Sequence, residues 1–104
     1  MKTINAQELA TLTRNGKAVI EFYGIGCLNC QIMQPILKDL ATAFPNINFY
    51  QVNITNEPEL IKKYQINSLP TILLFRHGQF LTSIIGVKHP QTLKRIIDQY
   101  LNYA

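Results

Sequence analysis

Nearly continuous apolar blocks alternate with amphipathic ones along the chain, and this alternation predicts strands separated by helices. Residues 17–24 form a short, almost unbroken apolar run, which is typical of a strand buried on both faces. Residues 47–54 predict a second core strand. Residues 27–44 and 90–102 instead repeat apolar side chains at helical spacing, which predicts two amphipathic helices.

Two shorter helices are predicted from signals at their N-termini. Asn5 can cap the first, because Glu8 stands three residues later as the partner of a capping box. Asn56 can cap the second in the same way with Glu59. Pro58 fits the first turn of that helix, where its missing N–H costs nothing.

The chain ends with a predicted β-hairpin and a last helix. Two β-rich apolar runs within residues 71–86 flank the dipeptide His77-Gly78. Strands joined through helices should be parallel, whereas a hairpin adds antiparallel strands. The expected fold class is therefore α/β, with a central mixed β-sheet of four to five strands flanked by helices on both faces. The length predicts a single domain, residues 1–104.

The buried faces of the two long helices are predicted from the spacing of their apolar residues. Pro35 should kink the first of these helices. The positions expected to face the core are Ile32, Ile36, Leu40 and Ala43 in the first helix, and Leu93, Ile96, Ile97, Tyr100 and Leu101 in the last.

Composition and charge exclude several classes of protein. Hydrophobic residues make up 47% of the chain and charged residues 15%, which fits a compact globular protein and not a disordered one. No apolar run approaches the ~20 residues of a membrane span, and the N-terminus lacks the apolar segment of a secretory signal. We therefore expect no membrane association and a cytoplasmic location. The net charge of +4 is scattered without a basic block, so no nucleic-acid partner is expected.

Both cysteines of the chain, Cys27 and Cys30, lie where a predicted strand passes into a predicted helix. Such a CxxC pair can be a structural disulfide, half of a metal site, a pair of iron–sulfur ligands shared between two chains, or a redox couple. Structural disulfides are rare in the cytoplasm. A zinc site needs about four ligands, and we expect the two histidines, His77 and His89, to be ordinary surface residues. These points favour the redox couple.

Helix electrostatics predict different roles for the two thiols. Cys27 would lie at the helix N-terminus, where the dipole and the unpaired N–H groups favour a thiolate and lower the pKa of the thiol. Cys30 would lie one turn further in and be more shielded. Since the thiolate is the nucleophile of disulfide exchange, we expect Cys27 to attack a partner's disulfide and Cys30 to resolve the mixed disulfide.

Three stretches of the chain together resemble the thioredoxin family, over residues 5–101. They are VIEFYGIGCLNCQIMQPIL, YQINSLPTILLFRHGQ and IIGVKHPQTLKRIIDQYL. A CxxC pair alone is moderately specific, but a CxxC at a strand–helix junction followed by Pro35 and by a later Leu-Pro-Thr is highly specific. The resemblance implies a thioredoxin fold and thiol–disulfide oxidoreductase activity.

The resemblance also implies roles for residues outside the cysteine pair. Pro70 matches the family's cis-proline that faces the dithiol, and a cis bond is physically reasonable before proline. The backbone of Leu69 would then bind an extended substrate segment. Gly86 matches a glycine that lets the partner's backbone approach. Glu21 matches a buried acid behind the resolving cysteine, and we expect it to relay a proton for Cys30.

Four positions around the cysteines depart from the family pattern. Leu28 and Asn29 replace the usual Gly-Pro. The Asn29 N–H can donate toward the Cys27 thiolate, which would stabilise the reduced form and make the protein more oxidising. Leu28 adds exposed apolar surface beside the nucleophile. Tyr23 and Gly26 stand where the family has two tryptophans, so we expect a flatter and less aromatic substrate surface.

The buried acid departs from the family pattern as well. Glu21 replaces the usual aspartate, and Gln51 falls where a lysine often pairs with that acid. Without this cation, desolvation should raise the pKa of Glu21 with less opposition. The alternative is a strand acid that simply reaches solvent.

The resemblance implies a protein-disulfide reductase that acts on disulfide-containing proteins. A flavin- and NADPH-dependent thioredoxin reductase would recharge it. No bound cofactor is expected, because the redox-active Cys27–Cys30 disulfide itself carries both electrons, and a monomer is expected. Two alternatives stay open: a redox-sensitive adaptor that uses the same surface to hold one partner, and a more oxidising oxidase or isomerase.

Overall fold

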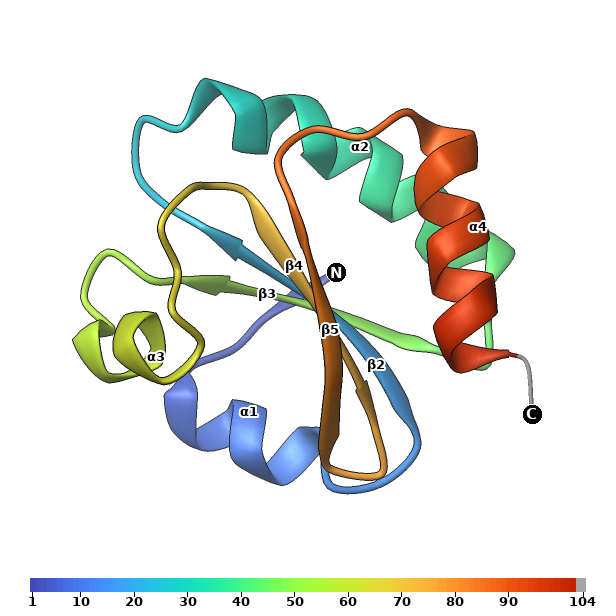
Figure 1. The fold of residues 1–104 in the computed structure, drawn as a ribbon, viewed down its shortest axis with the longest axis horizontal. Helices are drawn as coiled ribbons and strands as arrows, with labels where there is room; N and C mark the ends of the chain where they lie inside the picture. Colours follow the sequence, from blue (N-terminus) through green and yellow to red (C-terminus); the bar gives the residue numbers. More distant parts are fainter. Residues whose placement is uncertain (103–104) are drawn as a thin grey trace.

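The computed structural model describes residues 1–102, and their arrangement is shown in Figure 1. The elements follow one another in the predicted order, with a short first strand added at the N-terminus. They are β1 (Lys2–Thr3), α1 (Ala6–Leu12), β2 (Lys17–Tyr23), α2 (Leu28–Ala43), β3 (Asn48–Asn53), α3 (Pro58–Lys63), β4 (Thr71–Arg76), β5 (Gln79–Ile85) and α4 (Pro90–Leu101).

The strands form one five-stranded sheet in the order β1-β3-β2-β4-β5. Strand β3 runs parallel to β1 and β2, whereas β4 runs antiparallel to β2 and β5. The mixed sheet of the predicted α/β class is thereby confirmed. The β4–β5 turn is the predicted hairpin, and His77 and Gly78 both have positive φ, 49° and 81°, as the favoured two-residue hairpin turn requires.

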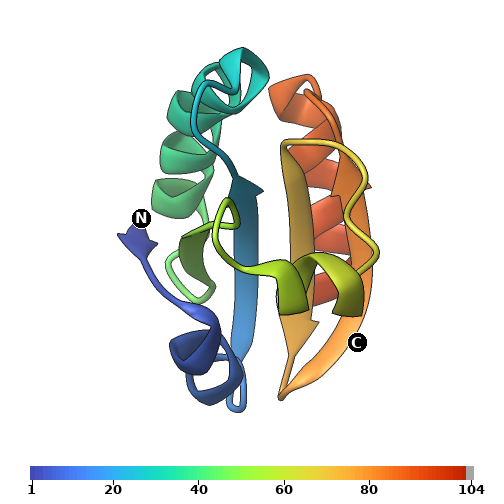
Figure 2. The ribbon, with the colours of Figure 1, turned by 90° about the vertical axis from the view of Figure 1, so that its left-hand side faces the viewer.

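The helices cover the two faces of the sheet in pairs. In Figure 1, α2 and α4 lie above and to the right of the sheet, and α1 and α3 lie below and to the left. Side chains alternate between the two faces along β2, so Val19 packs in the core under α2 and α4, and Ile20 packs in the core that includes α1 and α3. Figure 2 shows β2 and β4 side by side, as their antiparallel pairing requires.

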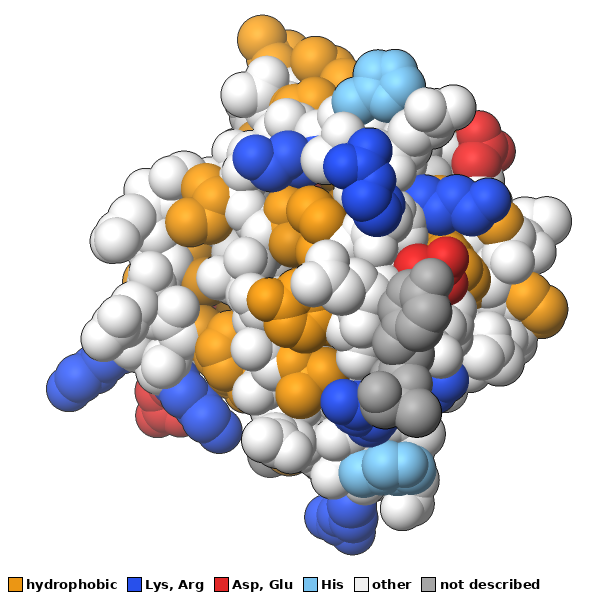
Figure 3. Space-filling view, turned by 45° about the vertical axis from the view of Figure 1, so that its right-hand side comes forward, with side chains coloured by type: hydrophobic (Ala, Val, Ile, Leu, Met, Phe, Trp, Pro, Cys, Tyr) orange, Lys and Arg blue, Asp and Glu red, His pale blue; other side chains and the backbone are white. Residues whose placement is uncertain are grey.

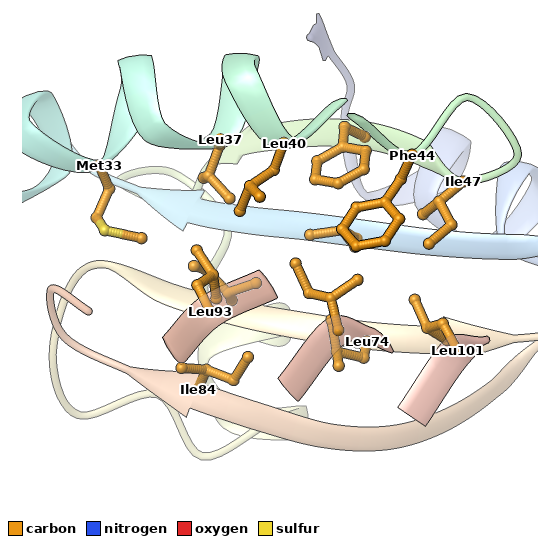
Figure 4. Close-up of a cluster of buried hydrophobic side chains, with 13 residues drawn as sticks. Met33, Leu37, Leu40, Phe44, Ile47, Leu74, Ile84, Leu93 and Leu101 are labelled. Atoms are coloured by element: carbon orange, nitrogen blue, oxygen red, sulfur yellow. The ribbon is translucent and has the colours of Figure 1, made fainter. Parts of the chain in front are cut away.

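The buried face of α2 differs from the predicted one by a one-residue rotation. The helix buries Cys30, Met33, Leu37 and Leu40, and its C-cap Phe44 joins the same cluster. Ile32 and Ala43 are exposed, so their predicted core positions are wrong, and Ile36 is only partly buried. Two overlapping sets of apolar positions fit helical spacing in α2. The buried set is the one that continues to Phe44, which is bulkier than Ala43 and lies toward the side chains of α4 (Figure 4).

The last helix buries most of its predicted face. Leu93, Ile97 and Leu101 are fully buried, whereas Ile96 is partly buried and Tyr100 is exposed. Within residues 1–102, no helix combines the length and the apolar character that crossing a membrane would require.

One of the two predicted capping boxes is present. The Asn5 side chain accepts a hydrogen bond from the Glu8 N–H (2.8 Å), and the Glu8 carboxylate accepts one from the Asn5 N–H (3.1 Å). The helix α3 is present with Pro58 in its first turn, but the predicted Asn56 cap is wrong, because the N-cap is Glu57 and makes no side-chain hydrogen bond. The Glu57 N–H donates to the Ile54 carbonyl (3.0 Å), so residue 56 lies within a backbone turn. The helix therefore begins one residue later than predicted.

Candidate active site

Strand β2 and helix α2 position the two cysteines. The strand ends at Tyr23, a short loop follows, and Cys27 is the N-cap of α2. Cys27 and Cys30 form a disulfide with their Cα atoms 5.3 Å apart. Cys27 is half-buried, whereas Cys30 is only 3% exposed. The expected asymmetry between an accessible first thiol and a shielded second one is therefore present in the structure.

The backbone of the first helical turn is directed at the sulfur of Cys27. The Cys30 N–H donates to Cys27 Sγ over 3.1 Å. An amide donor and the positive end of the helix dipole both stabilise a thiolate more than a thiol, so reduction of the disulfide should leave a nucleophilic sulfur at this position. The amide that bonds this sulfur belongs to Cys30 and not to Asn29, so in the disulfide form the expected contribution of Asn29 is not made.

The Leu69-Pro70 segment lies beside the cysteine loop. The peptide bond before Pro70 is cis, as predicted. The first residue of β4, Thr71, pairs with Phe22 near the end of β2, which brings the two loops to the same end of the sheet. At Gly24 an added Cβ would lie 2.9 Å from Leu69 Cδ1, so the two loops are in direct contact.

Gly86 is held against the same segment. Its N–H donates to the Pro70 carbonyl (2.9 Å), and its φ of +83° is a conformation that favours glycine. An added Cβ at Gly86 would meet nothing within 4 Å, so the surface there is open. The structure thus brings Cys27, Cys30, Leu69, Pro70 and Gly86 to one end of the molecule, as the sequence predicted.

Glu21 lies in the middle of β2 and is completely buried, which excludes the alternative of a strand acid that reaches solvent. Its Oε1 accepts a hydrogen bond from Gln34 Nε2 (2.9 Å), whereas its Oε2 has no partner within residues 1–102. Desolvation by burial raises the pKa of Glu21 from 4.5 to about 7. The predicted direction of this shift is confirmed.

Gln34 and Gln51 form a chain of amides at Glu21. Gln51, the β3 neighbour of Glu21, accepts from Gln34 Nε2 (2.6 Å) and donates to Thr3 Oγ1 (2.8 Å). At the position where the family often has a lysine, this chain therefore has the uncharged amide of Gln51, which is hydrogen-bonded to Gln34 and Thr3. Gln34 was not among the predicted site residues, although its place four residues after Cys30 puts it on the same face of α2.

A cleft of about 400 Å³ opens at the disulfide. Its lining carries no charged side chain and includes glutamines from α2 and β3. Gly26 lines it with a φ of +76° and nothing within 4 Å of an added Cβ, so a side chain would extend into open space here. The lining includes Tyr23, Cys27, Cys30, Gln31, Gln34 and Gln51.

Exposed apolar side chains lie close in sequence to the cysteines or flank Gly86, and we refer to them as the apolar collar: Ile25, Leu28, Ile32, Ile85 and Val87. Ile25 and Leu28 flank Cys27 in the sequence and are 81% and 73% exposed. Ile85 and Val87 flank Gly86 and are 57% and 40% exposed. Only Leu28 of this set was predicted to be an exposed site residue, because an apolar pattern by itself does not tell which side chains stay outside the core.

The collar continues into a shallow groove between β5 and α4. Ile85 belongs to both, and Ile96 and Tyr100 line the groove from α4. Figure 3 shows hydrophobic side chains on this face with basic side chains around them. The apolar surface next to the disulfide is thus larger than the immediate surroundings of Cys27.

The two histidines lie elsewhere and are exposed, as expected. His77 is in the hairpin turn, and His89 caps α4 through its Nδ1, which accepts from the Gln91 N–H (3.2 Å). Among residues 1–102, no three His, Cys, Asp or Glu side chains gather closely enough to hold a metal ion.

Comparison with known proteins gives consistent matches over the whole fold. The thioredoxin of Chlamydia pneumoniae is 25% identical over 100 residues, which cover 96% of this chain and 98% of that protein. Mitochondrial thioredoxin-3 of Saccharomyces cerevisiae is 34% identical over 98 residues, covering 93% and 77%. The solved oxidized structure of that yeast thioredoxin superimposes with a TM-score of 0.86 at 32% identity, over 95% of this chain and 94% of the other.

A further solved structure supports the fold alone. Thioredoxin f2 of Chlamydomonas reinhardtii superimposes with a TM-score of 0.89 at 21% identity, over 100% of this chain and 99% of the other. The family model described as Thioredoxin matches residues 2–99. The protein therefore belongs to the thioredoxin family, and it is a thiol–disulfide oxidoreductase of the protein-disulfide reductase type with Cys27 and Cys30 as its CxxC pair.

Proposed function

We propose that this protein reduces protein disulfides with Cys27 as the attacking sulfur, Cys30 as the resolving sulfur and Glu21 as the proton relay. The observation that carries the assignment is the asymmetry of the pair. Cys27 is accessible at the helix cap and accepts the Cys30 N–H, whereas the Cys30 side chain is buried. An accessible, electrostatically stabilised thiolate is the better nucleophile toward another protein.

The two exchange steps balance in sulfur bonds and protons. The Cys27 thiolate attacks one sulfur of the substrate disulfide, that disulfide breaks, and the released substrate thiolate takes up a proton. The Cys30 thiol then gives its proton to Glu21 and attacks Cys27 Sγ. This second exchange releases the other substrate sulfur as a thiolate, which takes up the proton held by Glu21, and leaves the oxidised Cys27–Cys30 disulfide. The substrate gains two electrons and the dithiol loses them.

Burial and position support the relay role of Glu21. Gln34, which hydrogen-bonds Glu21, stands one helical turn after Cys30 on the same face of α2. A carboxyl whose pKa is about 7 exchanges protons readily near neutral pH, which suits general acid–base catalysis.

The substrate surface follows from the exposed groups around the disulfide. The Leu69 backbone would pair with an extended segment of the substrate, and Gly86 leaves room for its backbone to pass. Tyr23, Gly26, Leu28 and Asn29 would contact the residues next to the substrate's disulfide. The exposed apolar collar should favour the binding of substrates that carry apolar side chains beside a cysteine.

The partners of the proposed cycle are disulfide-containing proteins on one side and a flavin- and NADPH-dependent thioredoxin reductase on the other. Another solved structure, 31% identical to this chain, concerns thiol resolution in a yeast mitochondrial 1-Cys peroxiredoxin by glutathione/thioredoxin systems, which makes peroxidase thiols one substrate class to test. We propose a monomer in the cytoplasm. The yeast relative is mitochondrial, so family membership does not by itself assign a compartment.

The reduction potential of the Cys27–Cys30 couple tests the direction of electron flow. We expect a value between about −270 mV and about −230 mV, the reducing part of the range of such proteins, from equilibration with glutathione redox buffers. A potential above about −180 mV would instead assign an oxidase or isomerase. Asn29→Pro is the matched variant. In the reduced form we expect the Asn29 N–H to donate to the Cys27 thiolate, so its removal should lower the potential by about 30 mV, equivalent to ~1.4 kcal/mol for two electrons.

A further inference from the structure

Gln34 occupies a bridging position between the helix of the resolving cysteine and the buried acid. Its single amide nitrogen donates to Glu21 Oε1 (2.9 Å) and to Gln51 Oε1 (2.6 Å). A primary amide has two N–H groups, so both bonds are made at once and the donor capacity of Gln34 is fully used. Gln51 is fixed in turn by its bond to Thr3 on β1. The Gln34 side chain is therefore held from two strands of the sheet.

From this arrangement we infer that Gln34 is a positioning residue, which holds the Glu21 carboxyl so that Oε1 is always an acceptor and Oε2 is the oxygen that exchanges the proton with Cys30. The inference rests on the proposed relay role of Glu21 and adds to it the residue that orients the carboxyl. Gln34 itself touches neither the substrate nor the sulfur atoms in this scheme.

The two carboxyl oxygens have different surroundings, and the difference identifies the proton-carrying one. In a neutral carboxyl the carbonyl oxygen is the stronger acceptor, so the N–H bond to Oε1 favours the proton on Oε2. Oε2 is buried without a partner within residues 1–102. An unpartnered buried polar atom costs free energy, so its presence calls for an explanation. Proton exchange between Oε2 and the thiol of Cys30, which lies one helical turn from Gln34, explains why this oxygen is left without a partner.

Besides burial, which raises the pKa of Glu21, the polar contact of its carboxyl within residues 1–102 is the hydrogen bond from Gln34. Its sheet neighbours are Gln51 on β3 and Ile72 on β4, and Gln34 reaches it from α2. The titratable groups that line the adjoining cleft are Tyr23 and, after reduction, the thiols of Cys27 and Cys30. Within residues 1–102 the one ion pair joins Lys2 and Glu8 at the surface. Among these residues no cation forms an ion pair with Glu21, so none could take the place of the hydrogen bond from Gln34.

Replacing Gln34 by methionine tests the inference with little change in volume. Gln34→Met removes the donor to Oε1, and because that bond favours the carboxylate, the pKa of Glu21 should rise by about one unit. The measurement is an NMR titration of the Glu21 carboxyl carbon in the oxidised protein. Gln34→Ala removes the same donor without adding bulk and should give the same direction. A Glu21 titration that is unchanged in both variants would overturn the inference.

Gln31→Met is the matched control. Gln31 is exposed and lines the same cleft, but its side chain makes no hydrogen bond to Glu21, so the Glu21 titration should stay at the wild-type position. An equal shift in Gln31→Met would show a general effect of the cleft and would also overturn the inference.

Rates separate this inference from the relay role on which it rests. In Gln34→Met the midpoint of the pH–rate profile of disulfide reduction should move upward with the Glu21 titration. The same substitution added to Glu21→Gln should leave the profile of that variant unchanged. If Glu21→Gln reacts at the wild-type rate from pH 6 to 9, the relay role is wrong, and with it the assigned proton exchange at Oε2. If Glu21→Gln is slow while Gln34→Met changes neither titration nor profile, the relay stands and the role of Gln34 fails.

Discussion

A Cys30→Ser variant will accumulate as a mixed disulfide with its substrate through Cys27, and the adduct will outlive that of the wild-type protein by at least ~1000-fold. In the wild type the resolving thiol is already held beside Cys27, and the Cα atoms of the two cysteines are 5.3 Å apart. Intramolecular groups reach effective concentrations far above that of any added thiol. Serine has no thiolate, so the adduct must wait for an external one.

The hydrogen bond that stabilises Cys27 should survive in this variant. Its donor is the backbone N–H of residue 30, which a serine also supplies. Cys30→Ser should therefore attack a disulfide-containing peptide at close to the wild-type rate, and mass spectrometry under non-reducing conditions should place the adduct on residue 27. Cys27→Ser is the matched control and should form no adduct. An adduct on Cys30 in that control at the same rate would reverse the assigned roles.

Glu21→Gln will make the protein more stable at pH 8 by about 3 kcal/mol, while at pH 4 the two proteins will be similar. The pKa of Glu21 is 4.5 ordinarily and about 7 in the folded protein. Between these values the folded state holds a proton that the unfolded state releases, so stability falls as pH rises through the window and is level above it. A pKa shift of one unit corresponds to about 1.4 kcal/mol. The shift from 4.5 to about 7 therefore gives the expected stability difference of about 3 kcal/mol.

Urea unfolding of the two oxidised proteins at several pH values measures this difference directly. Subtracting the two curves removes the contributions of carboxyls that both proteins share. Glu59→Gln controls for the loss of an exposed carboxyl, because Glu59 lies on the surface of α3, and it should track the wild type closely. A stability difference for Glu21→Gln that is the same at pH 4 and pH 8 would rule out ionisation of Glu21 as its cause.

The order of elements and the position of the cysteine pair are predictable because their signals are local. The unbroken apolar run of β2 and the cap pairing of Asn5 with Glu8 depend on residues close in sequence. The cis bond before Pro70 follows from the family resemblance and not from the residues themselves. The chain order and the family pattern therefore suffice to place Cys27, Cys30 and Pro70 together.

The rotation of α2 and the start of α3 are not predictable from spacing. Two apolar stripes one residue apart fit α2, and packing against the sheet and α4 selects the one with Met33 and Leu37. Asn56 has the side chain of a good cap, but a backbone hydrogen bond from Glu57 to Ile54 moves the helix start. In both places tertiary contacts or turn geometry overrule a valid local signal.

The amide network and the apolar collar escape prediction for a different reason. Gln34 and Glu21 are 13 residues apart on different elements, and their contact depends on the rotation of α2 that the pattern leaves open. The collar residues Ile25, Ile32 and Ile85 are apolar, and apolar residues are assigned to a core by default. Their exposure becomes visible only when the loops are placed around the disulfide.

The reduction of insulin by dithiothreitol, followed as turbidity, tests most directly the claim that Cys27 and Cys30 reduce protein disulfides. We expect the protein to accelerate precipitation clearly, and Cys27→Ser, at the same concentration, to leave the uncatalysed rate. If the protein with both thiols intact gives no acceleration, the reductase assignment is contradicted, and a module that holds a partner on its apolar collar becomes the better description.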